Sequence, residues 1–293
     1  MNRRQFLEFS GRSFALASVA GALPRAARAQ AAPPQAAAPT PRRNRVKHSV
    51  CRWCYGGLSL DDLARNSAAM GISSVEILNE NEWAVVKKHG LACAVGIGPG
   101  SIPRGWNRKE RHDELVAQAE ALIPKAAAAG VPALVVFSGN RAGQPDAEGI
   151  EACAAGFRRV APIAEKHGVT LVMEILNSKV DHGDYAFDHM RYGVEVMQKV
   201  ASPRVKILYD IYHAQIMDGD VIRTIRDHKE LIGHYHTGGV PGRHEIDDTQ
   251  ELNYPAICRA IVETGYQGYV GQEFIPERDP MTSLRQAIDL CDV

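Results

Sequence analysis

Short apolar runs alternate with longer stretches of helical pattern along the chain from Val46 to its end. One of these runs, Ala133–Phe137, is apolar throughout, which is typical of a strand covered on both faces. Runs of this kind predict eight strands, at Val46–Cys51, Ser74–Leu78, Ala92–Gly96, Ala133–Phe137, Thr170–Glu174, Lys206–Tyr209, Ile232–Tyr235 and Gly268–Gln272. The stretches between them predict helices, for example Leu60–Met70, Arg111–Ala129, Gly149–His167, Phe187–Val200 and Tyr254–Thr264.

Glycines punctuate this alternation. A glycine follows a helical stretch and precedes a strand at Gly71, Gly90, Gly130, Gly168 and Gly265. Because glycine readily adopts the left-handed conformation that ends many helices, each of these positions predicts a helix C-terminus. Eight strand–helix units in succession, without a long excursion, predict a single-domain α/β protein with the (β/α)8 TIM-barrel fold.

A doubly wound open sheet is the alternative fold. Such a sheet would place a glycine-rich phosphate-binding loop directly after its first strand. Residues 52–57, with the sequence RWCYGG, lack that spacing, and the pattern shows no second domain. The barrel is therefore the fold that we predict for the catalytic domain, residues 46–293.

The first 45 residues precede the alternating pattern and have the layout of an export signal. The pair Arg3-Arg4 is followed by an apolar stretch, Ser13–Leu23, and Ala27–Ala29 offers a small-x-small cleavage site. This layout predicts a twin-arginine signal peptide over residues 1–29 and a Pro/Ala-rich linker over residues 30–45. A chance arginine pair on a short amphipathic helix is the alternative.

If the layout is a signal, the twin-arginine export machinery is a partner and the mature protein is periplasmic. The apolar stretch Ser13–Leu23 is shorter than the ~20 residues that a membrane-spanning helix needs. We therefore expect no stable membrane anchor.

Charge and cysteine content narrow the function classes. Lys+Arg and Asp+Glu both total 34, so the formal net charge is zero. Proteins that bind nucleic-acid phosphates usually have a basic excess, so we expect a small-molecule substrate and no nucleic-acid partner. Cys51 and Cys54 form a C-x-x-C, but no second such pair completes a zinc site. We predict that the cysteines are small buried side chains.

Polar residues stand at the carboxyl ends of several predicted strands, where the catalytic groups of a (β/α)8 barrel lie. The fifth to the eighth strand each end in a residue that can bind a metal: Glu174, Asp210, His236 and Glu273. The second strand carries Glu76 near its end, and this residue either lines the pocket or hydrogen-bonds within the barrel. Any one of these acids can instead be a cap or turn residue leading into a helix. Four on consecutive strands favour a site.

Three carboxylates packed together repel one another and raise each other's pKa. A divalent cation between them removes this repulsion. Three oxygen ligands and one imidazole suit Mn²⁺ or Mg²⁺, with Zn²⁺ or Co²⁺ as alternatives. The strand ends therefore predict a site for one divalent metal.

Loops beside these strand ends carry further candidates. His213 lies three residues after Asp210, so we expect it above the metal and in contact with substrate; a solvated loop histidine is the alternative. Arg243 follows the seventh strand and offers a guanidinium for a substrate oxygen, with a surface arginine as the alternative. We expect three loop acids to be solvated: Glu245, Asp247 and Asp248. Weaker pocket candidates are Trp53, Trp106, Lys179 and His182.

With these residues, nearly all of residues 46–293 resembles the xylose-isomerase-like barrel superfamily, and most closely the hydroxypyruvate isomerase family. The matching segments are Val240–Glu245, Glu251–Pro255, Gly265–Tyr266, Gly268–Glu273, Glu174–Asn177 and Asp210–His213. Hydroxypyruvate isomerases place Gln where His236 stands and Pro where Ile175 stands. The histidine is typical of the related epimerases, so the resemblance does not name the substrate.

The resemblance implies an isomerase or epimerase of a small hydroxycarbonyl or sugar substrate. The reaction would transfer protons through a cis-enediolate, with the metal as Lewis acid. The resemblance assigns roles to residues already introduced: metal ligands Glu174, Asp210, His236 and Glu273; acid/base pair Glu174 and Glu273; substrate contacts His213 and Arg243.

Other functions stay open on the same residues. A sugar or cyclitol dehydratase, which is a lyase, would form the same enediolate and expel a β-hydroxyl group. A non-catalytic exported sugar-binding barrel would keep the pocket but would not need four strand-end ligands. An apurinic-site endonuclease would need extra ligands for a multi-zinc cluster and a basic face, and the sequence shows neither. A homo-oligomer is compatible with the pattern.

Overall fold

The computed structural model of the chain describes residue 43 and residues 45–293. The predicted signal peptide and nearly all of the predicted linker lie outside these residues. The described part contains eight strands: β1 (Lys47–Cys51), β2 (Ser74–Glu76), β3 (Val95–Ile97), β4 (Ala133–Val136), β5 (Thr170–Glu174), β6 (Val205–Asp210), β7 (Ile232–Thr237) and β8 (Tyr269–Gln272).

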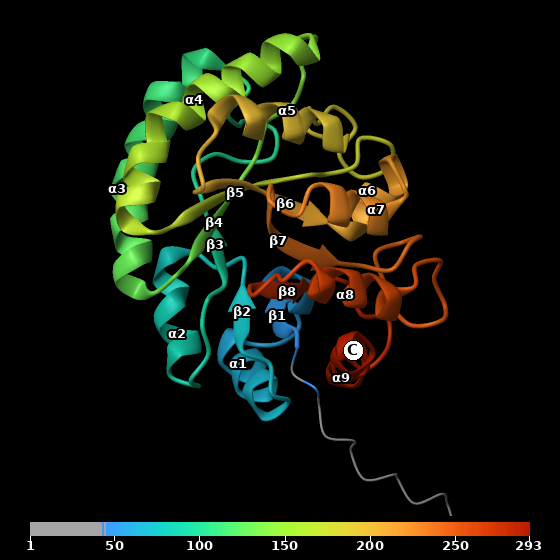
Figure 1. Cartoon of the computed structure of the whole chain (residues 1–293). Helices are drawn as coiled ribbons and strands as arrows, with labels where there is room; N and C mark the ends of the chain where they lie inside the picture. The colour runs from blue at the N-terminus through green and yellow to red at the C-terminus, as the bar shows by residue number, and fades with distance from the viewer. Residues whose placement is uncertain (1–42, 44) are drawn as a thin grey trace, which may run out of the picture. The chain divides into compact units, whose positions relative to one another are not determined.

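The strands form one parallel sheet that curves into a barrel (Figure 1). Their order is β2-β1-β8-β7-β6-β5-β4-β3, and every paired register is parallel. The first and last strands of this order meet through single bridges, Ser74 to Ala92 and Leu78 to Gly96. The sheet therefore comes back on itself, which confirms the predicted barrel over the open sheet.

Helices connect successive strands on the outside of the barrel (Figure 1). The α-helices are α1 (Leu60–Ala69), α2 (Trp83–Lys87), α3 (His112–Ala129), α4 (Asp146–His167), α5 (Met190–Val200), α6 (Ile211–Met217), α7 (Val221–Asp227), α8 (Tyr254–Glu263) and α9 (Pro280–Cys291). Short 3-10 helices are η1 (Arg52–Tyr55), η2 (Glu80–Glu82) and η3 (Lys109–Arg111). The five glycines predicted to end helices all have φ between 68° and 82°, the left-handed conformation expected for them.

Several boundaries differ from the predicted ones. β3 begins at Val95, later than predicted, because Ala92 contributes a bridge to Ser74 and not a continuous ladder. β7 continues to Thr237, so His236 is the second-last residue of the strand. α5 begins at Met190 and not at Phe187.

Alternation along the strands divides the apolar side chains into two clusters. On β4, Leu134 and Val136 belong to the large core between strands and helices, whereas Val135 belongs to a second, smaller cluster. Successive side chains of a strand point to opposite faces of the sheet, so the smaller cluster fills the inside of the barrel. Its buried members are Ala94, Val95, Ala133, Val135, Val172 and Leu208.

The two ends of the described barrel meet. Arg43 N–H donates to Asp292 Oδ2 at 2.7 Å, and Arg45 Nε donates to the Val293 carbonyl at 2.7 Å. These two residues belong to the predicted linker, so the end of that segment packs on the barrel.

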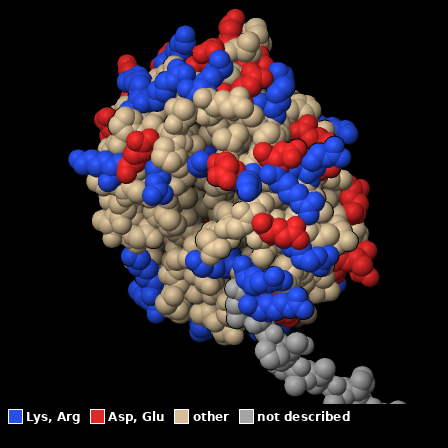
Figure 2. All heavy atoms as spheres, viewed as in Figure 1, with Lys and Arg blue, Asp and Glu red and all other residues tan. Residues whose placement is uncertain are grey.

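Charged side chains of both signs are interspersed over the face shown in Figure 2. None of the helices in the described residues is long and apolar enough to span a bilayer.

Candidate metal and substrate site

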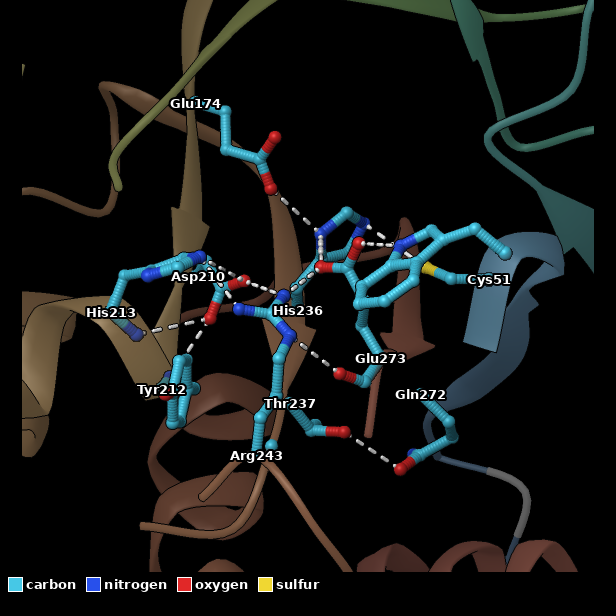
Figure 3. A network of polar contacts seen from close by, with 12 residues as sticks. Cys51, Glu174, Asp210, Tyr212, His213, His236, Thr237, Arg243, Gln272 and Glu273 are labelled. Atoms are coloured by element: carbon cyan, nitrogen blue, oxygen red, sulfur yellow. Dashed lines mark hydrogen bonds and ion pairs between the residues drawn. The ribbon is translucent and has the colours of Figure 1, made fainter. Parts of the chain in front are cut away.

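The four predicted metal ligands converge at the carboxyl ends of β5 to β8 (Figure 3). One donor atom from each of them lies within 4.8 Å of the donor atoms of the others. His236 Nδ1 is 3.1 Å from Glu174 Oε1 and 2.6 Å from Glu273 Oε2. All four side chains, including Asp210, are buried. Neighbouring parallel strands thus bring together three carboxylates and one imidazole that lie far apart in the sequence.

Asp210 is both a helix cap and a member of this group. Its Oδ1 accepts the backbone N–H groups of Tyr212 at 2.9 Å and His213 at 3.3 Å, which caps α6. The other oxygen, Oδ2, lies 2.6 Å from Arg243. The cap explanation for this strand-end acid is therefore correct for one oxygen, and the other oxygen faces Arg243 within the group of candidate ligands.

Glu76 on β2 orients the imidazole of His236 by contacting its Nε2 atom. Its Nε2 lies 2.8 Å from Glu76 Oε1, and His234 Nε2 lies 2.9 Å from the same oxygen. Burial alone would raise the pKa of Glu76, but His234 and His236 hold it well below its usual range, so the carboxylate stays ionised. With a metal in the site, an anionic acceptor at Nε2 would keep the imidazole proton there and leave the Nδ1 lone pair, which faces Glu174 and Glu273, available to bind the metal.

The position of Glu76 requires glycine on β8, which is separated from β2 by β1 in the sheet. A Cβ atom at Gly271 of β8 would lie 2.1 Å from Glu76 Oε1 and 2.8 Å from His236 Cδ2. Cys51 Sγ completes the surroundings, 3.6 Å from Glu76 Oε1 and 3.7 Å from His236 Nε2. Glu76 therefore hydrogen-bonds within the barrel, which is one of the two roles that its sequence position left open.

Arg243 brings a positive charge between two of the carboxylates. Its Nη2 lies 2.6 Å from both Asp210 Oδ2 and Glu273 Oε2, and Nε donates to the Glu273 carbonyl at 3.1 Å. The guanidinium also lies 4.8 Å from the ring centre of Tyr212 and 5.5 Å from that of Trp53. Arg243 is buried and has φ 61°, so it is a built part of the site and not a surface arginine.

The two glutamates of the predicted acid/base pair have different surroundings. Burial raises the pKa of Glu174, and the negative charge of Glu273 raises it further. Burial would also raise the pKa of Glu273, but the positive charges of His236 and Arg243 hold it well below its usual range. Two carboxyl groups whose pKa values are pushed apart can act as proton donor and proton acceptor.

The donor set fits a hard divalent cation. Burial raises the pKa of Asp210 to about 7 even though Arg243 opposes this shift. The carboxyl groups of Asp210 and Glu174 thus need more positive charge than the side chains around them supply. Three carboxylate oxygens and His236 Nδ1 are the ligand types that Mn²⁺ or Mg²⁺ accepts, and Zn²⁺ or Co²⁺ also binds such sets.

His213 lies beside this group and is not one of the four candidate ligands. The backbone N–H of Asn177 donates to His213 Nδ1 at 3.1 Å, and Asn177 Nδ2 lies 2.7 Å from the same atom. His213 Nε2 is 2.6 Å from Arg243 Nη1 and 3.7 Å from Asp210 Oδ2. Burial lowers the pKa of His213, and the charge of Arg243 lowers it further. The imidazole is therefore neutral, with its Nε2 edge toward the site.

A cavity of about 520 Å³ opens above these residues. Both glutamates of the pair line it, as do His213 and Arg243, the two predicted substrate contacts. Trp53 and His182, weaker candidates in the sequence, also line it, and Trp53 Nε1 donates to Glu273 Oε1 at 2.6 Å. The volume lies within the range of roughly 300–1,000 Å³ that is usual for small-molecule sites.

Other sequence candidates lie elsewhere. Trp106 is fully buried and stacks on Phe157, so it packs in the core. The expectation that Glu245 and Asp247 are solvated was wrong. Both are buried, because Glu245 accepts from the backbone N–H groups of residues 277 and 278 and Asp247 pairs with Arg278. Asp248 is exposed, as expected.

The cysteines are free thiols among the described residues, and all are buried apart from Cys54, which is partly exposed. The sequence therefore predicted their character but not the contact of Cys51 with His236.

Asn177 was also missed as the residue that holds His213. Its only signal was its place after the fifth strand, within a segment that matched the family.

The model of the xylose isomerase-like TIM barrel family matches residues 65–292. The 2-oxo-tetronate isomerase of Pectobacterium atrosepticum is 29% identical over 230 residues, which is 73% of this chain and 86% of that protein. The hydroxypyruvate isomerase of Escherichia coli is 29% identical over 212 residues, 71% of this chain and 74% of that protein. A Danio rerio relative is 35% identical over 121 residues, and the alignment spans 44% of its length.

A solved structure supports the same fold. The crystal structure of an AP endonuclease, family 2, from Brucella melitensis has a TM-score of 0.74 and 27% identity, and covers 81% of this chain and 96% of that one. The name AP endonuclease describes the Brucella melitensis protein and is not transferred to this chain. In the described part of this chain, the two residue groups able to hold a metal both contain His236, so they form one centre and not a spread cluster.

Proposed function

Because the chain belongs to the xylose isomerase-like TIM barrel family, we propose that it is a metal-dependent isomerase or epimerase of a small hydroxycarbonyl or sugar-like substrate. The observation that carries the proposal is the buried group of Glu174, Asp210, His236 and Glu273, whose donor atoms lie within 4.8 Å of one another. The hydroxypyruvate and 2-oxo-tetronate isomerases among the relatives support the reaction class.

Glu174 and Glu273 are the acid/base pair of this proposal. Both line the cavity, and one oxygen of each lies near His236 Nδ1, at 3.1 Å for Glu174 and 2.6 Å for Glu273. One glutamate removes the proton from the carbon beside the carbonyl group, and the other returns a proton to the substrate. A divalent cation held by the four donors would supply a Lewis acid that stabilises negative charge on the substrate oxygens.

His213 and Arg243 are the substrate contacts of the proposal. Both line the cavity, and the neutral His213 turns Nε2 toward the Arg243 end of the site. Arg243 is held by stacking on Tyr212 and by the Glu273 carbonyl, so its guanidinium is oriented before a substrate oxygen arrives. Such fixed donors help most where charge develops during the reaction.

The distinction between ligand and substrate contact can be tested at α6. Asp210→Asn should lower metal occupancy and activity together, and excess metal should restore part of both, because a neutral amide is a poorer ligand for a hard cation. His213→Ala should keep its metal and lose rate, because it removes a contact to substrate and not a ligand. Elemental analysis beside steady-state kinetics measures both. A metal-free His213→Ala with a metal-replete Asp210→Asn would reverse the two roles.

We also propose that the protein is exported by the twin-arginine route. The Arg3-Arg4 pair and the apolar stretch after it support this proposal. Replacing both arginines by lysine should trap uncleaved precursor inside the cell, whereas the unchanged chain should yield periplasmic protein beginning near Gln30. Fractionation and N-terminal sequencing give the result. Equal export of both forms would show that the pair is not a signal.

A further inference from the structure

The cavity above the metal-binding group has two unlike halves. Its charged and polar lining residues come from the ends of β5 to β8 and the loops after them, as described above. The opposite wall is apolar and comes mainly from the ends of β2, β3 and β4: Ile77, Ile102, Val135, Phe137 and, beyond β5, Leu176. Hydrogen-bonding side chains are lacking among the described residues of this wall, so it offers little to sugar hydroxyl groups.

The apolar wall is a built surface. Ile77 and Phe137 pack on the cluster that fills the inside of the barrel, and Val135 belongs to that cluster, so the wall is supported from beneath. Ile77 has φ 57°, a left-handed conformation that is unfavourable for a β-branched residue. Its N–H donates to the Val95 carbonyl at 2.7 Å, which holds the strained backbone in place. Strain of this kind is concentrated where side chains are positioned for a ligand.

The rim of the cavity is apolar as well. Three large hydrophobic side chains are exposed among the described residues: Trp53 at 47%, Val180 at 68% and Ile275 at 39%. Trp53 and Ile275 line the cavity, and Val180 precedes Asp181, another lining residue. Two of the three large exposed apolar side chains of the described residues therefore lie at the mouth of the site.

We propose that the natural substrate is a hydroxycarbonyl compound that carries an apolar group, aryl or branched alkyl, and that the wall of Ile77, Ile102, Val135, Phe137 and Leu176 binds this group. The proposal rests on the isomerase or epimerase function proposed above. The wall is continuous with the cavity that Glu174 and Glu273 line, so one molecule reaches both. A cavity of about 520 Å³ is also of a size that encloses a drug-sized ligand and not merely a three-carbon acid.

Binding of two hydroxamates to the Mn²⁺-loaded protein tests the wall without requiring turnover. Both probes present the same pair of oxygens, and they differ in the group that the wall would bind: methyl in acetohydroxamate and phenyl in benzohydroxamate. Even one methylene in a hydrophobic pocket changes affinity by roughly 10–200-fold. We expect calorimetry to show at least about tenfold tighter binding of benzohydroxamate. Equal affinities would overturn the proposal.

Substitutions in the apolar wall test whether the wall causes the preference for benzohydroxamate. Ile102→Asn and Phe137→Asn should remove most of the preference for benzohydroxamate and leave the affinity for acetohydroxamate nearly unchanged. Phe137→Leu keeps an apolar surface and should keep most of it. Ile222→Asn is the matched control, because Ile222 is a partly buried isoleucine of α7 that packs on the main core and does not line the cavity. A preference that survives both asparagine variants would also overturn the proposal.

A turnover arm separates this proposal from the one that it rests on. The probes are hydroxyacetone and 2-hydroxyacetophenone, followed by NMR in D₂O. In each, one C–H bond breaks at the hydroxymethyl carbon, a C–H bond forms at the former carbonyl carbon and a proton moves between the oxygens, so no oxidant is needed. Deuterium exchange without a preference for the phenyl compound would refute the apolar subsite but not the isomerase proposal. Wall-dependent hydroxamate binding without any exchange would support the subsite and count against the isomerase.

A second copy of the chain is the competing occupant of the apolar rim. Sedimentation velocity of the unchanged protein and of Ile102→Asn and Phe137→Asn tests it. If these variants turn an oligomer into monomers and leave both hydroxamate affinities unchanged, the face is a contact between copies and the substrate proposal is wrong. If the oligomeric state is the same in all of them and the phenyl preference is lost, the proposal is supported.

Discussion

Replacing Glu174 or Glu273 by glutamine should lower kcat on a true substrate by roughly 10²–10⁴, the usual loss when an acid/base group is removed. Glutamine has nearly the same shape but cannot take a proton from carbon. Both side chains line the cavity, and glutamine keeps their shape, so we expect both variants to retain the fold. Steady-state kinetics with excess Mn²⁺ measures the effect, because excess metal offsets any loss of affinity.

Glu263→Gln is the control for this pair. Glu263 is an exposed glutamate of α8 that pairs with Arg226 on the surface, so its replacement removes one negative charge far from the cavity. Its kcat should remain close to that of the unchanged protein. If Glu174→Gln and Glu273→Gln are as active as Glu263→Gln at saturating metal, the two glutamates are at most ligands and the acid/base assignment is wrong.

Glu76→Gln should weaken metal binding by roughly 10–100-fold, although Glu76 is not one of the four donors. The carboxylate accepts from both His234 and His236. The amide oxygen of glutamine carries no negative charge, so it is a weaker acceptor for the two imidazoles. His236 would then lose the partner that keeps its proton on Nε2 and Nδ1 free. Calorimetric titration with Mn²⁺ gives the affinity, and saturating metal should restore most of kcat.

A second variant separates this role from simple stabilisation. In Gly271→Ala, the added Cβ would lie 2.1 Å from Glu76 Oε1, so the carboxylate must move. It should weaken Mn²⁺ binding in the same direction as Glu76→Gln. If both variants lower the melting temperature but leave Mn²⁺ affinity unchanged, Glu76 has a structural role only.

The barrel and four residues of its candidate site could be predicted from local features of the sequence. Apolar runs such as Ala133–Phe137 identify buried strands, and glycines such as Gly130 and Gly168 mark helix ends. Once the strands are placed, the barrel topology brings their carboxyl ends together, so Asp210 and His236 become neighbours without further information. That step needs only the order of the strands.

The rest depends on contacts that no local pattern records. Glu76 and His236 are 160 positions apart, and their hydrogen bond depends on the absence of a side chain at Gly271. Glu245 looked like a solvated loop acid because its backbone donors belong to a distant loop that follows β8. The apolar wall was equally hidden, because Ile102 and Phe137 look like ordinary core residues in the sequence.

Solvent deuterium is the most direct test of the central claim, which is proton transfer between substrate carbon and the two glutamates of a metal-containing barrel. The Mn²⁺-reconstituted protein is incubated in D₂O with a panel of hydroxyketo acids, ketoses and 2-hydroxyketones. Mass spectrometry and NMR of the quenched mixtures then give the deuterium at carbon. The account predicts that deuterium enters the carbon beside the carbonyl group of at least one compound, and that Glu174→Gln and Glu273→Gln abolish this exchange. Turnover with no deuterium at carbon, or exchange that persists in both variants, would contradict it.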